Sequence, residues 1–218
     1  MILWPQLLAT LAAGAAAGIG ALPLLFIQHI PTWLQGSLLG FAGGMMTGAA
    51  LLSLLPSALN KGGLVQVMLG ITAGAGALMV LDKLLPHQHV RSGKPKATEW
   101  QSSLMIIAAI ILHNLPEGLT MGVGYAAGED QIGLILTVAI GIQNLPEGLL
   151  AALPLRENGV SGPKAVGLAL LTGLVEPAAA LIGMLLVDWL QSILGFFLAF
   201  AAGAMLYTVS DTLIPDSH

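Results

Sequence analysis

The sequence predicts an all-α membrane protein, a polytopic helix bundle with seven visible spans. Of the 218 residues, 56% are hydrophobic and only 8% are charged, whereas a typical soluble domain has about 25% charged residues. A helix needs about 20 mostly apolar residues to cross the roughly 30 Å hydrocarbon core of a bilayer. Seven stretches meet this length, with approximate limits at 7–27, 34–55, 64–85, 104–125, 132–153, 165–187 and 193–214.

Little of the chain is left outside these spans, so residues 1–218 are expected to form a single transmembrane domain. The first residues, Met1 to Pro5, carry no basic side chain, which favours a retained first helix over a cleaved signal peptide. The absence of cysteine excludes disulfides, thiolate metal ligands and cysteine nucleophiles. A net charge of −4 without a basic stripe gives no indication of nucleic-acid binding.

The basic residues indicate how the chain is oriented in the membrane. With seven spans the loops alternate between the two sides, and only Lys61 falls on one of them. The residues on the other side are Lys83, Arg91, Lys94, Lys96, Arg156 and Lys164. Because cytoplasmic loops carry the excess of Lys and Arg, this second side is predicted to face the cytoplasm and the N-terminus to face outward. We therefore expect a multi-pass protein of the cell inner (plasma) membrane.

Two internal repeats indicate an inverted repeat around a central pair of helices, the fourth and fifth spans. Residues 113–119 and 143–149, thirty positions apart, are identical at six of seven positions. A weaker match relates Phe41–Pro56 to Phe200–Pro215, in spans two and seven. Both pairs lie in spans that run in opposite directions, as in many transporter folds. If spans one to three map onto span six and onward, the third span has no partner, so we expect an eighth helix to follow the seven.

Three acidic residues, Glu117, Glu147 and Glu176, lie deep in predicted spans. Ionisable residues there are costly by a few kcal/mol and indicate a functional site. A single such Glu can also be structural, paired with a polar neighbour. However, no Lys or Arg lies deep in any span to neutralise these acids. Their neutralisation must then come from protons or from a bound cation.

The repeated motif places several polar side chains beside these acids. Residues three and four positions apart share one face of a helix, so the fourth and fifth spans present matching polar faces to each other. The residues predicted to bind metal are His113, Asn114, Glu117, Gln143, Asn144, Glu147 and Glu176. Three carboxylates, one imidazole and several amides suit a divalent cation. For His113, a hydrogen-bonded packing role is the alternative.

Proline and glycine in the motif have physical uses of their own. Pro116 and Pro146 each remove one helical hydrogen bond and are predicted to kink their helices, which frees a carbonyl to coordinate or stay hydrated. Gly118 and Gly148 allow neighbouring helices to approach closely.

Ser53 and Asp211 lie toward the ends of their spans, where contact with water explains polar residues adequately. We also consider them as candidates to line an exit path for the ion.

These residues carry a resemblance to a known family. The HNLPEG and QNLPEG helices, followed by Leu-Val-Glu-Pro at 174–177, resemble the ZIP (Zrt/Irt-like) divalent metal transporters, especially the bacterial GufA-like branch. The resemblance implies eight helices, a homodimer and no prosthetic group. It also implies transport toward the cytoplasm, between the fourth and fifth helices, of Zn²⁺ and in many cases Cd²⁺, Fe²⁺, Mn²⁺ or Co²⁺.

The resemblance further implies a two-ion site. Glu117 and Glu147 would bridge the ions, and His113 and Gln143 would complete the first. The ligands implied for the second ion are Asn114, Asn144 and Glu176. Some relatives have an acidic residue where this chain has Asn144, which lowers the charge around the second ion.

Two other functions are alternatives to transition-metal transport. A channel or carrier for another cation fits an all-oxygen site, but the imidazole of His113 favours a transition metal. An intramembrane metalloenzyme would use the carboxylates to hold a metal that activates water. No HExxH sequence and no plausible nucleophile set accompany the carboxylates, so we expect a transporter and not an enzyme.

Overall fold

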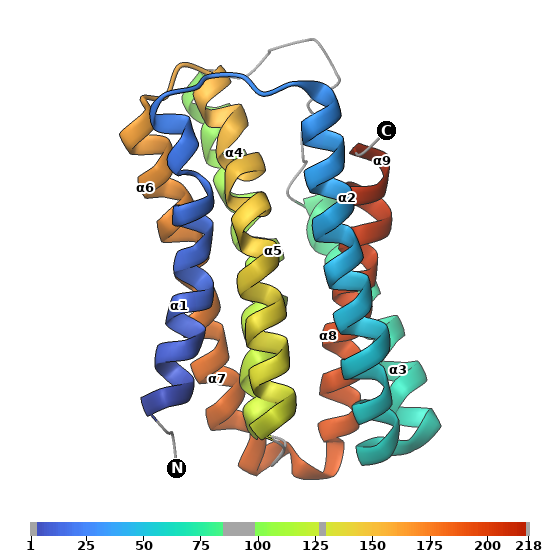
Figure 1. The fold of residues 1–218 in the computed structure, drawn as a ribbon. Coiled ribbons are helices and arrows are strands. Elements are labelled where there is room, and N and C mark those ends of the chain that lie inside the picture. The colour runs from blue at the N-terminus through green and yellow to red at the C-terminus, as the bar shows by residue number, and fades with distance from the viewer. Residues whose placement is uncertain (1–3, 85–98, 127–129, 217–218) are drawn as a thin grey trace.

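The computed structural model describes residues 4–84, 99–126 and 130–216 (Figure 1). Over these residues the regular structure is helical and contains no strand, which confirms the all-α prediction. The α-helices are α1 (Trp4–Gly20), α2 (Thr32–Gly48), α3 (Leu55–Leu84), α4 (Glu99–Ala126), α5 (Asp130–Glu157), α6 (Gly162–Gly173), α7 (Val175–Leu190), α8 (Leu194–Thr208) and α9 (Ile214–Asp216). Between them lie the 3-10 helices η1 (Leu22–Leu25) and η3 (Gln191–Ile193) and the π-helices η2 (Ala49–Leu54) and η4 (Val209–Leu213).

Within the described residues, five helical segments are long and apolar enough to cross a membrane, so the chain is a multi-pass membrane protein. They are Trp4–Leu25, Thr32–Val80, Gln131–Glu157, Gly162–Leu186 and Leu194–Asp211. Thr32–Val80 has 49 residues and contains the second predicted span and most of the third. The fourth predicted span lies within α4, which is not among the five. The number of seven spans therefore stays a prediction.

The helices fall into two groups that lie side by side in Figure 1. In the first group, α1, α4, α5, α6 and α7 pack against one another; in the second, α3 packs along α8, and α2 lies beside them. Contacts of α2 with α5 and of α4 with α8 join the groups. An apolar core that includes Met46, Leu136, Leu198 and Met205 fills this junction. All of the residues predicted to bind metal come from the first group.

The long segment Thr32–Val80 is interrupted at Gly63. A straight helix of 49 residues would extend about 74 Å, more than twice the roughly 30 Å hydrocarbon core. Gly63 has φ 69°, a left-handed conformation that glycine adopts without the steric cost of a Cβ atom. The resulting kink divides α3 at the position where the sequence predicts the third span to begin.

Gln66 of α3 caps the N-terminus of α8. Its Nε2 donates a hydrogen bond to the carbonyl of Ser192 at 3.0 Å, and its Oε1 accepts one from the backbone N–H of Phe196 at 3.1 Å. The N-cap residue of α8 itself, Ile193, makes no side-chain capping bond. The first turn of a helix has N–H groups without an acceptor in the same helix. The side-chain amide of Gln66 provides an acceptor from α3, because the residue at the N-cap of α8 has none.

We therefore expect Gln66→Leu to lower the melting temperature of the detergent-solubilised protein. Loss of both hydrogen bonds should cost about 1–2 kcal/mol, or roughly 2–8 °C in Tm for a domain of this size. Thr72→Val is a matched control on α3, because the Thr72 hydroxyl donates only to Met68 of the same helix. Equal Tm values for both variants and the unmodified chain would contradict the capping role.

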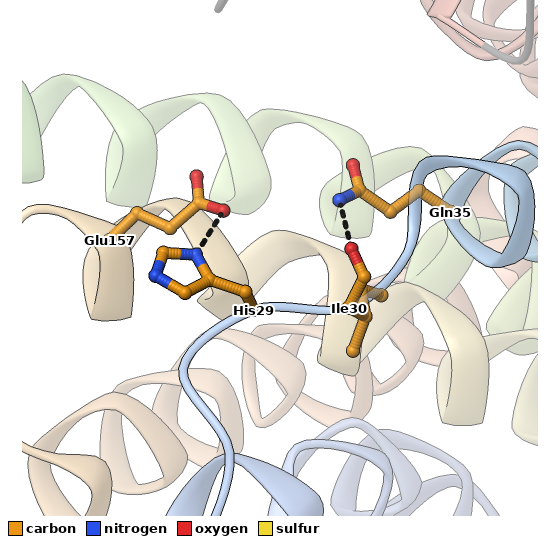
Figure 2. Close-up of polar contacts among 4 residues, drawn as sticks. All are labelled: His29, Ile30, Gln35 and Glu157. Atoms are coloured by element: carbon orange, nitrogen blue, oxygen red, sulfur yellow. Dashed lines mark hydrogen bonds and ion pairs between the residues drawn. The ribbon is translucent and has the colours of Figure 1, made fainter.

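The connection between α1 and α2 is fastened to the end of α5. Arg156 Nε donates to the carbonyl of Leu24 at 3.0 Å. Figure 2 shows His29 Nδ1 3.4 Å from Glu157 Oε1, and Gln35 Nε2 donating to the carbonyl of Ile30 at 3.0 Å. The exposed histidine contact contributes little on its own, but together these contacts fix the link between the two helix groups.

The two π-helices occur at equivalent places in the weaker sequence repeat. The N–H of Leu55 donates to the carbonyl of Ala50, and that of Ile214 donates to Val209. Donors and acceptors are each 159 positions apart, the same separation as in the sequence match. π-helical turns are rare and often mark functional sites.

Candidate functional site

The paired motifs lie in α4 and α5, which pack on each other and are flanked by α7 and α1, respectively. Both helices continue through their motif prolines, Pro116 and Pro146. α6 and α7 meet beside them, with α6 ending at Gly173 and α7 beginning at Val175. The predicted sixth span is thus two helices, and Glu176 lies in the first turn of the second one, where the helix dipole favours a negative charge.

Glu117 and Gln143 are both fully buried and face each other across α4 and α5. Gln143 Nε2 donates to Glu117 Oε1 at 2.8 Å. The second carboxylate oxygen, Glu117 Oε2, and the amide oxygen, Gln143 Oε1, are buried and have no hydrogen-bond partner. The pair therefore presents two acceptor oxygens that no donor in the described part of the chain satisfies.

Glu147 adds a third such oxygen. It lies one turn beyond Gln143 on α5, and residues four apart share one helix face. Its Oε2 atom is buried without a hydrogen-bond partner.

Asn144 and Glu176 form a separate buried pair. Asn144 Nδ2 donates to Oε1 and Oε2 of Glu176 at 2.8 and 2.9 Å. The same nitrogen lies 2.9 Å from the carbonyl oxygen of Ala13 in α1. A single amide thus ties α5 to both α7 and α1.

Asn114 of α4 makes the matching contact on the other side. Its Nδ2 donates to the carbonyl of Thr172 at 3.0 Å. Thr172 lies in the last turn of α6, where carbonyls have no partner within the helix. The interruption between α6 and α7 therefore provides the acceptor that Asn114 uses.

Gly118 and Gly148 lie against neighbouring backbone, as the sequence predicted. A Cβ atom on Gly118 would clash with the carbonyl oxygen of Glu176, and one on Gly148 would clash with that of Ala17. Backbone-to-backbone contact of this kind is how membrane helices pack closely through small residues. It sets the distance of α7 from α4 and of α1 from α5.

The contacts of α4 and α5 are related by the same separation as the weaker repeat. Thr172, which accepts from Asn114, lies 159 positions after Ala13, which accepts from Asn144. Gly118 lies against Glu176, and Gly148 lies against Ala17. Glu176 and Ala17 are also 159 positions apart. At the centre, Gly14 and Gly173 pack against each other and are also 159 positions apart.

The structure places the predicted metal residues in two sets. Glu117, Gln143 and Glu147 carry the unsatisfied oxygens, whereas Asn144 and Glu176 bond to each other. Across the described residues, no three His, Cys, Asp or Glu side chains come together as a metal-binding group. Asn114 lies beside α6. His113 is part of α4, but its side chain is outside what the structure describes.

The two exit-path candidates lie in the π-helices, Ser53 in η2 and Asp211 in η4, and both are partly buried. A role for either residue in an exit path stays a prediction.

Sequence reasoning missed several contributors to the site. The carbonyls of Ala13 and Thr172 fix the two asparagines, and backbone acceptors leave no sequence signal. Thr120 is buried, and its Oγ1 donates to the carbonyl of Pro116 at 2.8 Å; its position four residues after the proline was the available signal.

The three unsatisfied oxygens on the motif residues of α4 and α5 share one chemistry. Glu117, Gln143 and Glu147 offer only acceptor oxygens there, and a buried acceptor without a donor costs about 1–3 kcal/mol. A cation with oxygen ligands would satisfy all three. Such groups attract a divalent ion.

Comparison with known proteins agrees with this geometry. A family model described as ZIP zinc transporter matches residues 82–218. The chain is 41% identical to the zinc transporter GufA of Myxococcus xanthus, over 97% of this chain and 88% of the relative. It is 39% identical to zinc transporter ZIPB of Bordetella bronchiseptica (95% and 71%) and 36% identical to zinc transporter ZupT of Corynebacterium glutamicum (95% and 87%). The chain therefore belongs to the ZIP zinc transporter family, a family of transporters and not of enzymes, as its paired motifs predicted.

Proposed function

We propose that this chain carries a divalent transition-metal ion, zinc first, across the membrane toward the cytoplasm. The ion passes between α4 and α5. The observation that carries the proposal is the set of three buried oxygens, on Glu117, Gln143 and Glu147, that accept no hydrogen bond from the described residues. A mobile cation satisfies such oxygens when it is bound and leaves them free when it departs. Relatives at 41% and 39% identity are named as zinc transporters.

The seven predicted metal residues line this site. The ligands that contact the ion are Glu117, Gln143 and Glu147, together with the imidazole of His113. An imidazole added to oxygen ligands suits zinc and its neighbours Cd²⁺, Fe²⁺, Mn²⁺ and Co²⁺ better than alkali ions. The metal is cargo, and no prosthetic group is part of the proposal.

The chain crosses the membrane seven times in this proposal. The break in the segment Thr32–Val80 at Gly63 supports two crossings there. Figure 1 shows the Trp4 end of α1 and α9 at opposite ends of the bundle, as an odd number of crossings requires.

The spans form an inverted repeat about α4 and α5. Its support is the separation of 159 positions, shared by the partners of the two asparagines, by the Gly14–Gly173 contact and by the hydrogen bonds of the two π-helices. In this relation α1 corresponds to the α6–α7 pair, and α2 corresponds to α8.

We place the protein in the plasma membrane with its N-terminus outside. The end of α5, which carries Arg156, and the start of α6, near Lys164, lie at one end of the bundle, and the bend of α3 at Gly63, beside Lys61, lies at the other. The positive-inside rule then assigns the first end to the cytoplasm. Large apolar side chains such as Leu52 and Val65 face outward and are suited to lipid. A homodimer follows from the family resemblance alone.

The test is zinc uptake by proteoliposomes loaded with a zinc-sensitive dye. The unmodified chain should give saturable uptake that protein-free liposomes lack, and Cd²⁺, Fe²⁺, Mn²⁺ or Co²⁺ should compete. Potassium and sodium in place of zinc should give no comparable flux. If zinc does not enter the vesicles, or if an alkali ion enters equally fast, this function is wrong.

A further inference from the structure

We infer that the transport site holds one cation at a time, at Glu117, Gln143 and Glu147, because Asn144 and Glu176 form a closed hydrogen-bonded pair that positions helices and leaves no second ion site. This inference rests on the proposed function and departs from the two-ion arrangement that the family resemblance implies.

The carboxylate oxygens that a second ion would need as ligands already accept hydrogen bonds. Both carboxylate oxygens of Glu176 accept from Asn144 Nδ2, at 2.8 and 2.9 Å, and this nitrogen also lies 2.9 Å from the carbonyl oxygen of Ala13. Asn144 is 2% exposed and Glu176 is fully buried. Neither residue has a buried polar side-chain atom without a partner, whereas Glu117, Gln143 and Glu147 each have one.

The orientation of the Asn144 amide is fixed by its surroundings. Oxygen and nitrogen of an amide are assigned from the hydrogen-bond network. A reversed Asn144 would direct its oxygen at the Glu176 carboxylate and at the Ala13 carbonyl, so that only acceptors would meet. The NH₂ group must therefore point at the carboxylate, where a cation would otherwise bind.

The asparagine of the other half shows that this role is structural. Asn114 donates to the carbonyl of Thr172, and Asn144 donates to the equivalent carbonyl, that of Ala13. Each amide thus donates to a backbone carbonyl of a neighbouring helix, α6 for Asn114 and α1 for Asn144. Only one of them also meets a carboxylate, because the position equivalent to Glu176 is occupied by Ala17. The hydrogen bonds from Asn144 to Glu176 are therefore additional to an asparagine-to-carbonyl contact that joins helices in both halves.

Glu176 also does not join the other two acids in one ligand group. The described part of the chain has no three His, Cys, Asp or Glu side chains close enough to hold an ion together. A cation at Glu117 and Glu147 must then complete its shell with Gln143 and the His113 side of α4. The acidic residue of α7 acts as a positioning residue through Asn144.

The experiment counts zinc ions bound per chain. Purified protein in detergent is stripped with a chelator and equilibrated with ZnCl₂. Bound zinc is then measured by mass spectrometry against protein from amino-acid analysis. The unmodified chain should bind one ion. Asn144→Asp should bind two, because it replaces the donor by a carboxylate facing Glu176 and a cation must then neutralise the pair. Zinc should also raise the Tm of Asn144→Asp more than that of the unmodified chain.

Glu176→Gln and Glu176→Ala test the positioning role without relying on Asn144→Asp. Both should still bind one ion, and the alanine variant alone should lose Tm, since the glutamine can still accept from Asn144. Two ions on the unmodified chain, falling to one in Glu176→Gln, would overturn the inference. The proposed function fails separately, if the unmodified chain binds no zinc or if Glu117→Gln,Glu147→Gln binds as much as the unmodified chain does.

Discussion

Zinc uptake by the Glu117→Ala,Glu147→Ala double variant should fall by about 100-fold or more in proteoliposomes. Each carboxylate has a buried oxygen that no donor in the described part of the chain satisfies, so each is free to bind the ion directly. Loss of a group that merely orients a metal ligand already costs 10–100-fold in affinity, and removal of two ligands should exceed that. Initial rates over a range of zinc concentrations provide the measurement.

The matched control is Glu157→Ala. Glu157 is also on α5, but it lies at the end of the helix and its side chain contacts His29. Its removal deletes one negative charge from the same helix and should leave the uptake rate within about twofold. The Tm of the double variant should not fall by more than a few degrees, because Glu117 loses a single internal hydrogen bond. Near-normal uptake by the double variant would refute the assignment of the site.

Much of the candidate site was predictable from the sequence because its signals are local. An acid within an apolar span marks a functional position by its cost alone, which indicated Glu117, Glu147 and Glu176. Helical spacing placed Gln143 and Glu147 on one face of α5. Glycine in a membrane helix predicted close packing at Gly118 and Gly148, and both contact neighbouring backbone.

The remaining features depend on partners that are distant in sequence. The sequence predicted that Asn144 and Glu176 belong to the site, but not that they bond to each other. That bond requires α6 to end at Gly173, which brings Glu176 into the first turn of α7. The capping of α8 by Gln66 could not be predicted from the sequence either, because it joins residues 130 positions apart. The number of spans also stayed open, because Thr32–Val80 is one continuous segment and α4 is not among the five apolar segments of the described residues.

Gly148→Ala should lower both the stability and the transport rate of the protein. In a helix, Gly to Ala normally stabilises by about 0.5–1 kcal/mol. Here the added Cβ would meet the carbonyl oxygen of Ala17, and backbone of this kind cannot rotate aside as a side chain can. Overpacking costs about 1–3 kcal/mol, which outweighs the gain and should lower Tm by several degrees. Thermal unfolding in detergent measures this effect.

Gly76→Ala in α3 is the control with the opposite sign. A Cβ at Gly76 has no atom within 4 Å, so the substitution should raise Tm or leave it unchanged. An equal Tm for the two variants would mean that α1 does not pack against Gly148.

The effect of Gly148→Ala on transport should exceed its effect on folding, because Gly148 adjoins Glu147. A shift of α5 by a few tenths of an ångström displaces that carboxylate relative to Glu117, and misplacement by about 1 Å can cost a hundredfold in rate. Uptake measured at a temperature where both variants are folded separates the two effects.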